Sequence, residues 1–208
     1  MIIRQLGRVD YQDTWDKMRA FTDARTPETE DELWVCEHAP VFTQGVAGKS
    51  EHLLFNPLSI PVVKTDRGGQ ITYHGPGQAM VYVLLNLKRA GYGVRELVLR
   101  IENAVIALLA AHGVEAYGKR DAPGVYVMLQ QQEAKIAALG LKVRNSHTYH
   151  GLAFNVNMDL TPFSAINPCG YEGLRVTQLH ELGVNLSLEA AGTALADELR
   201  RQLTAPAK

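Results

Sequence analysis

The sequence predicts an α+β fold built around a mixed β-sheet, and three observations support this. A helix is expected over 94–111, because apolar residues recur there at helical spacing and Gly113 stands where a C-cap glycine belongs. The segment 80–86 begins with six apolar residues, which is typical of a strand buried on both faces. Several strands then follow one another between 125 and 157, which favours α+β over regular βαβ alternation.

The remaining elements follow in chain order. A short strand at 2–6 leads to a helix that Asp10 caps and that reaches about residue 24. Ser187 is expected to cap a last helix over 188–203, before a frayed tail. Further strands are expected at 33–37, 62–64, 70–73, 125–129, 135–139, 141–144 and 152–157, with a turn at 130–132.

Size and composition favour one soluble domain. The chain has 208 residues, of which 46% are hydrophobic and 21% charged, and a formal net charge of −1. Such a charge creates no overall field for nucleic acid or an anionic membrane, so neither is expected as a partner. No run of eighteen apolar residues is present, and two distant cysteines make no disulfide framework. We therefore expect a cytoplasmic protein.

The most informative segment is 67–78, Arg-Gly-Gly-Gln-Ile-Thr-Tyr-His-Gly-Pro-Gly-Gln. Its first glycine pair permits a close approach of the backbone to a ligand, and its Gly-Pro-Gly forms a rigid turn. We expect Arg67, Tyr73, His74 and Gln78 to cluster at the mouth of a sheet. The alternative is a plain hairpin with ordinary corner glycines.

Two residues stand out as candidates for chemistry. Cys169 lies between a proline and a glycine, which suggests an accessible loop, whereas Cys36 lies in an apolar strand and is expected to be inert packing. A thiol needs an activator, either one of seven histidines or a lysine such as Lys135. Lys135 opens a strand of small residues that leaves room for a ligand, although an edge lysine facing water would look the same.

Metal and nucleotide sites are not expected. His147 and His150 have i, i+3 spacing, but the sequence supplies no further ligands for a metal. No phosphate-binding P-loop is present, and the glycines around Tyr92 do not form a dinucleotide fingerprint. We therefore expect no cofactor.

With these residues assembled, the chain resembles the lipoyl(octanoyl) transferase family. The resemblance spans about residues 33–185 and depends on five motifs in register. These are 67–78, Asp-Ala-Pro-Gly-Val-Tyr-Val at 121–127, Lys-Ile-Ala-Ala-Leu-Gly at 135–140, His-Gly-Leu-Ala-Phe-Asn at 150–155 and Asn-Pro-Cys-Gly at 167–170.

The resemblance implies a fold, a reaction and a set of residues. The fold would be that of the biotin and lipoate ligases, in a single catalytic domain over 1–208 with its core from about residue 30. Cys169 would be the acyl-thioester residue and Lys135 its activator. Ala138 departs from the family pattern, which commonly has Ser there, so a hydroxyl contact is lost. The residues implied for substrate binding are Arg67, Gly68, Gly69, Gln70, Ile71, Thr72, Tyr73, His74, Ala138, Leu139, Gly140, Gly151, Leu152 and Ala153.

The implied activity is octanoyl transfer in protein lipoylation, by a monomeric enzyme. The donor would be octanoyl-acyl carrier protein, and the acceptor a lysine of lipoyl domains in 2-oxoacid dehydrogenases and the glycine cleavage H protein. An apolar tunnel lined by Tyr73, Tyr82, Leu139 and Leu152 would hold the acyl chain. The oxyanion hole remains open between the amides of 75–77, those near Cys169, and His74.

Three other functions are compatible with the same residues. The first is an ATP-dependent lipoate or biotin ligase, which needs no cysteine. The second is a non-catalytic module that binds acylated carrier proteins, which needs neither Cys169 nor Lys135. The third is an amidotransferase that moves octanoyl groups between lipoyl domains.

Overall fold

The computed structural model describes residues 1–56, 59–167 and 174–206, and these residues form an α+β fold with a mixed β-sheet. The predicted fold class is therefore confirmed. The expected extent of one catalytic domain over 1–208 stays a prediction.

Within these residues, the larger sheet has eight strands. Its order is β1 (Ile2–Val9), β2 (Glu32–His38), β6 (Gln78–Leu84), β10 (His147–Asn155), β9 (Gln132–Arg144), β8 (Gly124–Leu129) and β7 (Tyr117–Gly118). The short β11 (Arg175–Val176) pairs with β9. The β1–β2 and β9–β11 pairs are parallel and the others antiparallel, so the sheet is mixed.

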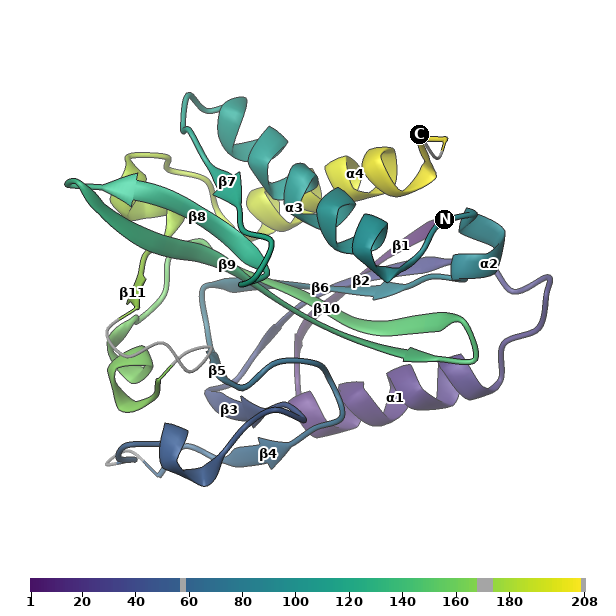
Figure 1. The fold of residues 1–208 in the computed structure, drawn as a ribbon, viewed down its shortest axis with the longest axis horizontal. Coiled ribbons are helices and arrows are strands. Elements are labelled where there is room, and N and C mark those ends of the chain that lie inside the picture. The colour runs from purple at the N-terminus through teal and green to yellow at the C-terminus, as the bar shows by residue number, and fades with distance from the viewer. Residues whose placement is uncertain (57–58, 168–173, 207–208) are drawn as a thin grey trace.

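Helices cover both faces of the larger sheet (Figure 1). On one face lie α3 (Val94–Ala110) and α4 (Leu188–Thr204), whose apolar sides pack on β2, β6 and β8 to form the main core. On the other face lies α1 (Tyr11–Asp23), which buries Met18 against Trp34 and Tyr82. The two predicted N-caps are confirmed, since Asp10 accepts from the amide of Asp13 and Ser187 from that of Ala190.

A smaller sheet lies beside α1 (Figure 1) and consists of β4 (Val62–Lys64), β3 (Val41–Gln44) and β5 (Ile71–His74). It carries a separate apolar cluster around Phe42, Tyr73 and Ile166. The hairpin alternative for 67–78 is wrong, because β5 belongs to the smaller sheet and β6 to the larger one. The turn at 75–77 therefore carries the chain from one sheet to the other.

Three sequence expectations differ from the structure. The strands expected at 135–139 and 141–144 are one strand, β9, because Gly140 pairs with Gly151 without a break in the ladder. The strand expected from 152 begins at His147, after a turn in which Asn145 and Ser146 have positive φ. Seven short elements of the described residues were not predicted, namely β3, η1 (Ser50–His52), α2 (Leu87–Ala90), β7, η2 (Thr161–Ala165), β11 and η4 (Leu179–Leu182).

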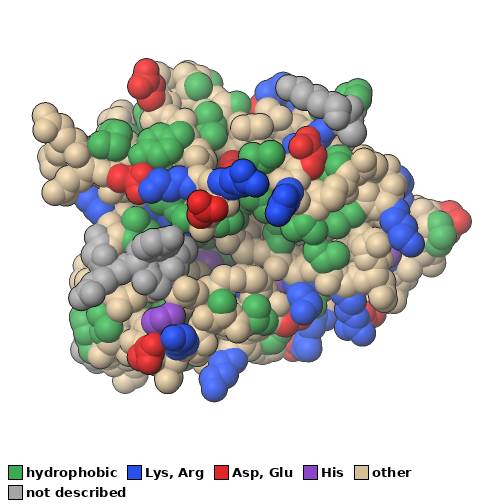
Figure 2. Space-filling model, in the orientation of Figure 1, with side chains coloured by type: hydrophobic (Ala, Val, Ile, Leu, Met, Phe, Trp, Pro, Cys, Tyr) green, Lys and Arg blue, Asp and Glu red, His purple; other side chains and the backbone are tan. Residues whose placement is uncertain are grey.

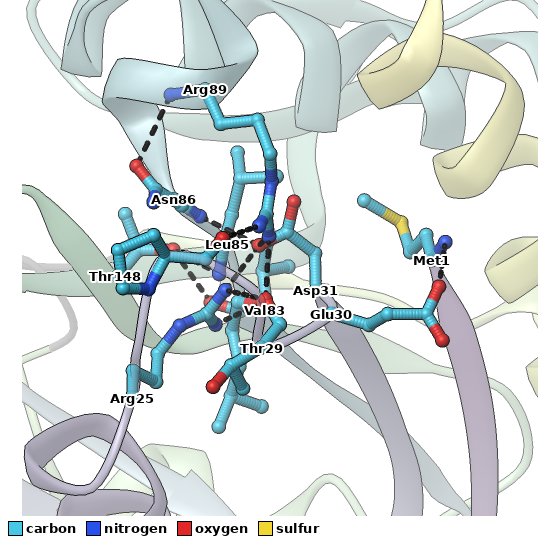
Figure 3. A network of polar contacts seen from close by, with 12 residues as sticks. Met1, Arg25, Thr29, Glu30, Asp31, Val83, Leu85, Asn86, Arg89 and Thr148 are labelled. Carbon is cyan, nitrogen blue, oxygen red and sulfur yellow. Dashed lines mark hydrogen bonds and ion pairs between the residues drawn. The ribbon is translucent and has the colours of Figure 1, made fainter.

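An ion-pair network fixes the loops at one end of the larger sheet (Figure 3). Asp31 forms ion pairs with Arg25 and with Arg89, and Arg89 Nη2 lies 2.6 Å from Asp31 Oδ1. Asp31 also accepts a hydrogen bond from the amide of Asn86. Arg25 further donates to the carbonyl of Leu84 at 2.9 Å. Arg89, one of the basic residues on the surface, is thus engaged in holding the fold.

Candidate active site

A narrow cavity of about 60 Å³ lies between the two sheets and follows β9 and β10. Its described walls come from α1, β5, β6, β9, β10, β11, the loop 67–70 and η2. Figure 2 shows the surface hollowed near the centre of this view, with Lys and Arg side chains around the hollow. The lining combines apolar side chains, such as Met80, Leu139 and Leu152, with polar ones, among them Lys135 and His150, and its apolar part suits an unbranched chain.

Arg67 holds the loop 67–70 against β3. It is 7% exposed and donates to the carbonyls of Thr43, Gly68 and Gln70, at 2.5, 3.0 and 2.8 Å respectively. The amide of Gly68 also donates to the carbonyl of Leu141, at 2.8 Å, which joins the loop to β9. The guanidinium therefore fixes the part of the cavity wall that this loop forms.

A chain of buried hydrogen bonds crosses one side of the cavity. His74 Nδ1 donates to Gln78 Oε1 at 2.8 Å, because an amide oxygen only accepts, and its Nε2 accepts from the hydroxyl of Thr43. Gln78 donates to Asn155, which in turn donates to the carbonyl of Thr177. Burial lowers the pKa of His74 to about 3, so its ring is neutral. Both ring nitrogens are engaged, which argues against His74 as an oxyanion donor.

A second histidine supports the wall formed by Tyr82. His38 Nδ1 donates to the carbonyl of Val9, so its Nε2 accepts from the Tyr82 hydroxyl at 2.6 Å. Tyr11 stacks on His74 with ring centroids 5.8 Å apart. Burial raises the pKa of Tyr11 to about 12 and that of Tyr82 well above its usual value, so both hydroxyls stay protonated.

Lys135 lies at one end of the cavity, and we call this the proximal end. The residue is 4% exposed, and its ammonium lies 5.2 Å from the centre of the Tyr126 ring, within the range of a cation–π contact. A Cβ on Gly124 would collide with Lys135 Cε, so the glycine leaves the space that this side chain occupies. Lys135 is thus a buried cavity residue, and the edge lysine facing water is excluded.

Glu102 of α3 lies beside this end of the cavity. It is 4% exposed, and its Oε1 accepts the amide of Gly124 at 2.9 Å. Burial raises the pKa of Glu102, while the Gly124 amide and the charge of Lys135 oppose the rise. A carboxylate therefore supports the turn that packs against Lys135.

The other end of the cavity, which we call the distal end, is lined by His150, whose hydrogen-bond partner is Asp66. Asp66 Oδ1 accepts from His150 Nε2 at 3.0 Å and from Trp15 Nε1 at 3.1 Å, and its Oδ2 accepts from the Tyr149 hydroxyl. Burial opposes ionisation, but the hydrogen bonds from His150 and Tyr149 outweigh it and hold the pKa of Asp66 below its usual range.

The backbone of β10 is irregular at the distal end. Neighbouring side chains of a regular strand point to opposite faces, yet Tyr149 and His150 both reach Asp66. His150 has φ 60°, and the β6–β10 pairing stops at Gly151. The Thr148 hydroxyl instead links β10 to the end of β6: it donates to the carbonyl of Val83 and accepts a hydrogen bond from the amide of Leu85 (Figure 3). A strained residue kept at a cavity is a mark of function.

The structure brings most of the predicted site residues together. The lining residues among them are Arg67, Gly69, Gln70, Ile71, Thr72, His74, Lys135, Ala138, Leu139, Gly140, Gly151, Leu152 and Ala153. Gly68 lies behind the wall, and Tyr73 packs on Phe42 and Phe163 instead of joining the expected cluster. Side chains alternate along β5, so His74 faces the cavity and Tyr73 faces the smaller core. Cys169 lies outside the described residues.

Some residues of the site were not predicted from the sequence. Asp66, Tyr11 and Glu102 had no role in the sequence analysis, although Asp66 directly precedes the 67–78 segment. Glu102 carried a usable signal, because it stands three residues before Val105 on the buried side of α3. Cys36 is buried, as expected, and burial raises the pKa of its thiol.

The described residues contain neither a metal cluster nor a membrane-spanning helix. No group of three or more His, Cys, Asp or Glu in residues 1–56, 59–167 and 174–206 could hold a metal ion. No helix in the same part of the chain is long and apolar enough to cross a membrane.

Sequence comparison identifies the family. Residues 10–200 match the lipoyl protein ligase A/B catalytic domain. The chain is 62% identical over 203 residues to the octanoyltransferase of Chromobacterium violaceum, covering 98% of this chain and 96% of that protein. It is 60% identical to the octanoyltransferase of Thiobacillus denitrificans, covering 98% and 91%. The chain belongs to the octanoyltransferase family. It is therefore an enzyme, an acyltransferase.

Among solved structures, two kinds of ligase share the fold of this chain. Lipoate-protein ligase A bound with ATP superposes with a TM-score of 0.77 at 17% identity, covering 99% of this chain and 86% of the ligase. Biotin protein ligase from Aquifex aeolicus, in complex with biotin and ATP, gives a TM-score of 0.62 at 17% identity, covering 97% and 69%. At this identity the likeness concerns the fold alone.

Proposed function

We propose that this octanoyltransferase moves an octanoyl group from acyl carrier protein to a lysine of a lipoyl domain, through a thioester on Cys169. The observation that carries the proposal is Lys135, a buried cation at one end of an apolar cavity that the 67–74 segment lines. The acceptors would be the lipoyl domains of 2-oxoacid dehydrogenases and the glycine cleavage H protein. The enzyme would act as a monomer in the cytoplasm.

The first half-reaction forms the acyl-enzyme. The Cys169 thiolate attacks the carbonyl carbon of the donor thioester, a new carbon–sulfur bond forms, and the bond to the carrier breaks. The ammonium of Lys135 gives its proton to the departing carrier thiolate and becomes an amine. At ~4 Å and an effective dielectric constant near 20, the attraction of an ammonium for a thiolate is roughly 4 kcal/mol, which favours the reactive form of Cys169.

The second half-reaction restores the enzyme. The neutral ε-amine of the acceptor lysine attacks the acyl-enzyme carbonyl, a carbon–nitrogen bond forms, and the bond to Cys169 breaks. The amine of Lys135 takes the proton that the new amide loses and returns to an ammonium. Protons and charges balance over the two steps, and neither ATP nor a metal is required.

The cavity supports an acyl substrate. Met80, Leu139 and Leu152 line it, and small residues such as Ala138 leave room between the strands. Each methylene removed from water contributes about 0.8 kcal/mol, so an eight-carbon chain gains several kcal/mol from burial. Among the candidate oxyanion donors, the amide of Gly77 already donates to Glu37 Oε1 at 2.7 Å, which leaves the amide of Gly75 and those near Cys169.

Intact mass spectrometry tests the proposal. The protein is mixed with octanoyl-acyl carrier protein, and wild type should gain one octanoyl group. Cys169→Ala should gain none, while Cys36→Ala, a matched control at the buried cysteine, should gain it normally. Adding a lipoyl domain should then move the group to the acceptor. No mass gain in wild type would contradict the proposal.

The alternative functions predict different results in the same assay. Formation of octanoyl-adenylate from octanoate, ATP and Mg²⁺ would favour a ligase. Binding of the acylated carrier without a covalent adduct would favour a non-catalytic module. Transfer from an octanoylated lipoyl domain but not from the carrier would favour an amidotransferase.

A further inference from the structure

The cavity has a direction that the strand register defines. Its lining residues on β9 run from Lys135 to Gly140, and those on β10 run from Asn155 to His150. In the antiparallel pair His150 lies opposite Leu141, six positions along β9 from Lys135. At about 3.3 Å per residue, the proximal and distal ends are roughly 20 Å apart along the strands.

The space between the two ends matches a short chain. The Lys135 side chain leans along β9 toward Gly124, which pairs with Ala138, and so occupies part of this length. An extended chain of eight carbons, with bonds of about 1.5 Å, is roughly 9 Å long. A chain attached near Lys135 therefore ends close to the distal wall.

The distal wall is anchored on both strands. His150 is 2% exposed and tied to Asp66, which Tyr149 and Trp15 hold in turn. On the β9 side the strand packs tightly against the loop 67–70, because a Cβ on Gly140 would lie 2.9 Å from the Gly68 carbonyl oxygen and 3.0 Å from Arg67 Cδ. A longer chain would have to displace buried, hydrogen-bonded groups.

We propose that His150, held in place by Asp66, is the stop that sets the acyl chain length. This inference depends on the proposed function, since the chemistry proposed at Lys135 defines where the chain begins. The imidazole of His150 forms a polar surface at the end of the cavity. The backbone of His150, with φ 60°, turns its side chain to the same side as that of Tyr149. Octanoyl groups fit in front of the ring, whereas longer chains must move it away from Asp66 and lose a hydrogen bond to a carboxylate.

Substitutions at His150 test the stop. His150→Asn is smaller and tolerates positive φ, and His150→Gly removes the side chain and relieves the backbone strain. Acyl-enzyme formation is measured with hexanoyl, octanoyl, decanoyl and dodecanoyl carrier proteins. The decanoyl-to-octanoyl rate ratio should rise about ten-fold in His150→Asn, equivalent to the ~1.4 kcal/mol of a ten-fold change. His150→Gly should also accept dodecanoyl.

Tyr149→Phe is the matched control. It removes another donor to Asp66 without enlarging the cavity, because Tyr149 is not among the described lining residues. Its rates should fall equally for all chain lengths, leaving the ratio unchanged. A ratio that stays constant in both His150 variants would overturn the proposal. So would an equal rise in Tyr149→Phe, since loosening of the wall rather than space would then be the cause.

A second measurement separates this inference from the proposed function. A series of free fatty acids, from hexanoate to dodecanoate, is titrated into Cys169→Ala. Binding is followed by tryptophan fluorescence, because the Trp15 ring lies 6.1 Å from that of His150. Adding His150→Asn should move the tightest binding from eight to ten or more carbons. If wild type forms no acyl-enzyme but this shift occurs, only the transfer chemistry fails. An unchanged length preference would reject the stop.

Discussion

The proximal and distal ends of the cavity differ in the charge they carry. At the proximal end the ammonium of Lys135 lies over the Tyr126 ring, near the carboxylate of Glu102. At the distal end the carboxylate is Asp66 and its histidine partner is His150. Burial lowers the pKa of His150 despite the opposing effect of Asp66, so the imidazole is neutral at pH 7.

This difference suggests that the two ends do different work. In the proposed mechanism the ammonium of Lys135 stabilises the thiolate and supplies a proton, so the proximal end is the one assigned to the chemistry. At the distal end the Asp66 carboxylate accepts three side-chain hydrogen bonds and exchanges no proton near neutral pH. It therefore holds the neighbouring side chains in place, and the distal end defines the shape of the cavity. The variants below test this division, from the largest expected effect to the smallest.

Removal of the proximal cation should have the largest effect. Lys135→Ala should bind the acyl donor normally but form the acyl-enzyme about 10²–10⁴-fold more slowly, because it loses both the thiolate partner and the proton carrier. The loss should be most severe at low pH, where the thiolate is scarcest. Lys135→Arg restores the charge but not proton transfer, and should recover only part of the rate. Quenched-flow mass spectrometry measures these rates, and a normal rate in Lys135→Ala would remove the lysine from the mechanism.

The second largest effect is expected from acidification, which should lower the free energy of unfolding. The pKa of His74 is about 3 in the folded protein, below the ordinary value near 6.5, so at intermediate pH the unfolded chain binds the extra proton. The free energy of unfolding should therefore fall as pH drops below about 6.5, by up to about 1.4 kcal/mol per pH unit for this group. His38, whose pKa burial also lowers, adds to the fall. Urea unfolding at pH 7 and pH 5 measures it.

A variant at the same histidine gives the control for this prediction. His74→Asn cannot titrate, so it should be less stable than wild type at pH 7 but lose less stability on acidification. Asp66 acts in the same direction at lower pH, since its depressed pKa contributes stability above about pH 4 that is lost below it. Equal pH slopes in wild type and His74→Asn would show that the buried imidazole is not the cause.

Glu102 should matter to both stability and rate. Glu102→Ala leaves the Gly124 amide without its acceptor and should cost about 1–3 kcal/mol of unfolding free energy. Glu102→Gln keeps an oxygen acceptor but removes the charge, so its stability should lie close to wild type. If the charge of Glu102 also matters to the reaction, acyl-enzyme formation should be slower in Glu102→Gln although its stability is nearly unchanged. An unchanged rate in Glu102→Gln would leave Glu102 with a purely structural role.

The smallest effect is expected at Trp15. Trp15→Phe removes one of the three donors to Asp66 from a partly exposed position and should cost about 1 kcal/mol of unfolding free energy. Rates for all acyl lengths should stay within a few-fold of wild type, because His150 and Tyr149 still hold the carboxylate. Thermal unfolding and the chain-length series check this. A loss as large as that in Glu102→Ala would mean that the distal end depends on Trp15 more than on its other donors.

Elements with strong local signals were predictable from the sequence. Both capped helices start at their predicted residues, and the helix over 94–111 corresponds to α3, with Gly113 at φ 75° just beyond its end. The turn between β8 and β9 lies at Gln130 and Gln131, within the predicted 130–132, and both residues have positive φ. By contrast, the four-residue β3 lacked a periodic pattern long enough to be recognised.

The sequence by itself determined the main helices, most strands and the segments that carry the family resemblance, because these depend on neighbours within a few residues. Only the tertiary structure decided that β5 and β6 lie in different sheets, that Tyr73 faces away from the cavity, and that Asp66 meets His150 across 84 positions of chain. Such contacts arise from burial and hydrogen bonding between distant segments, for which a single sequence contains no local pattern.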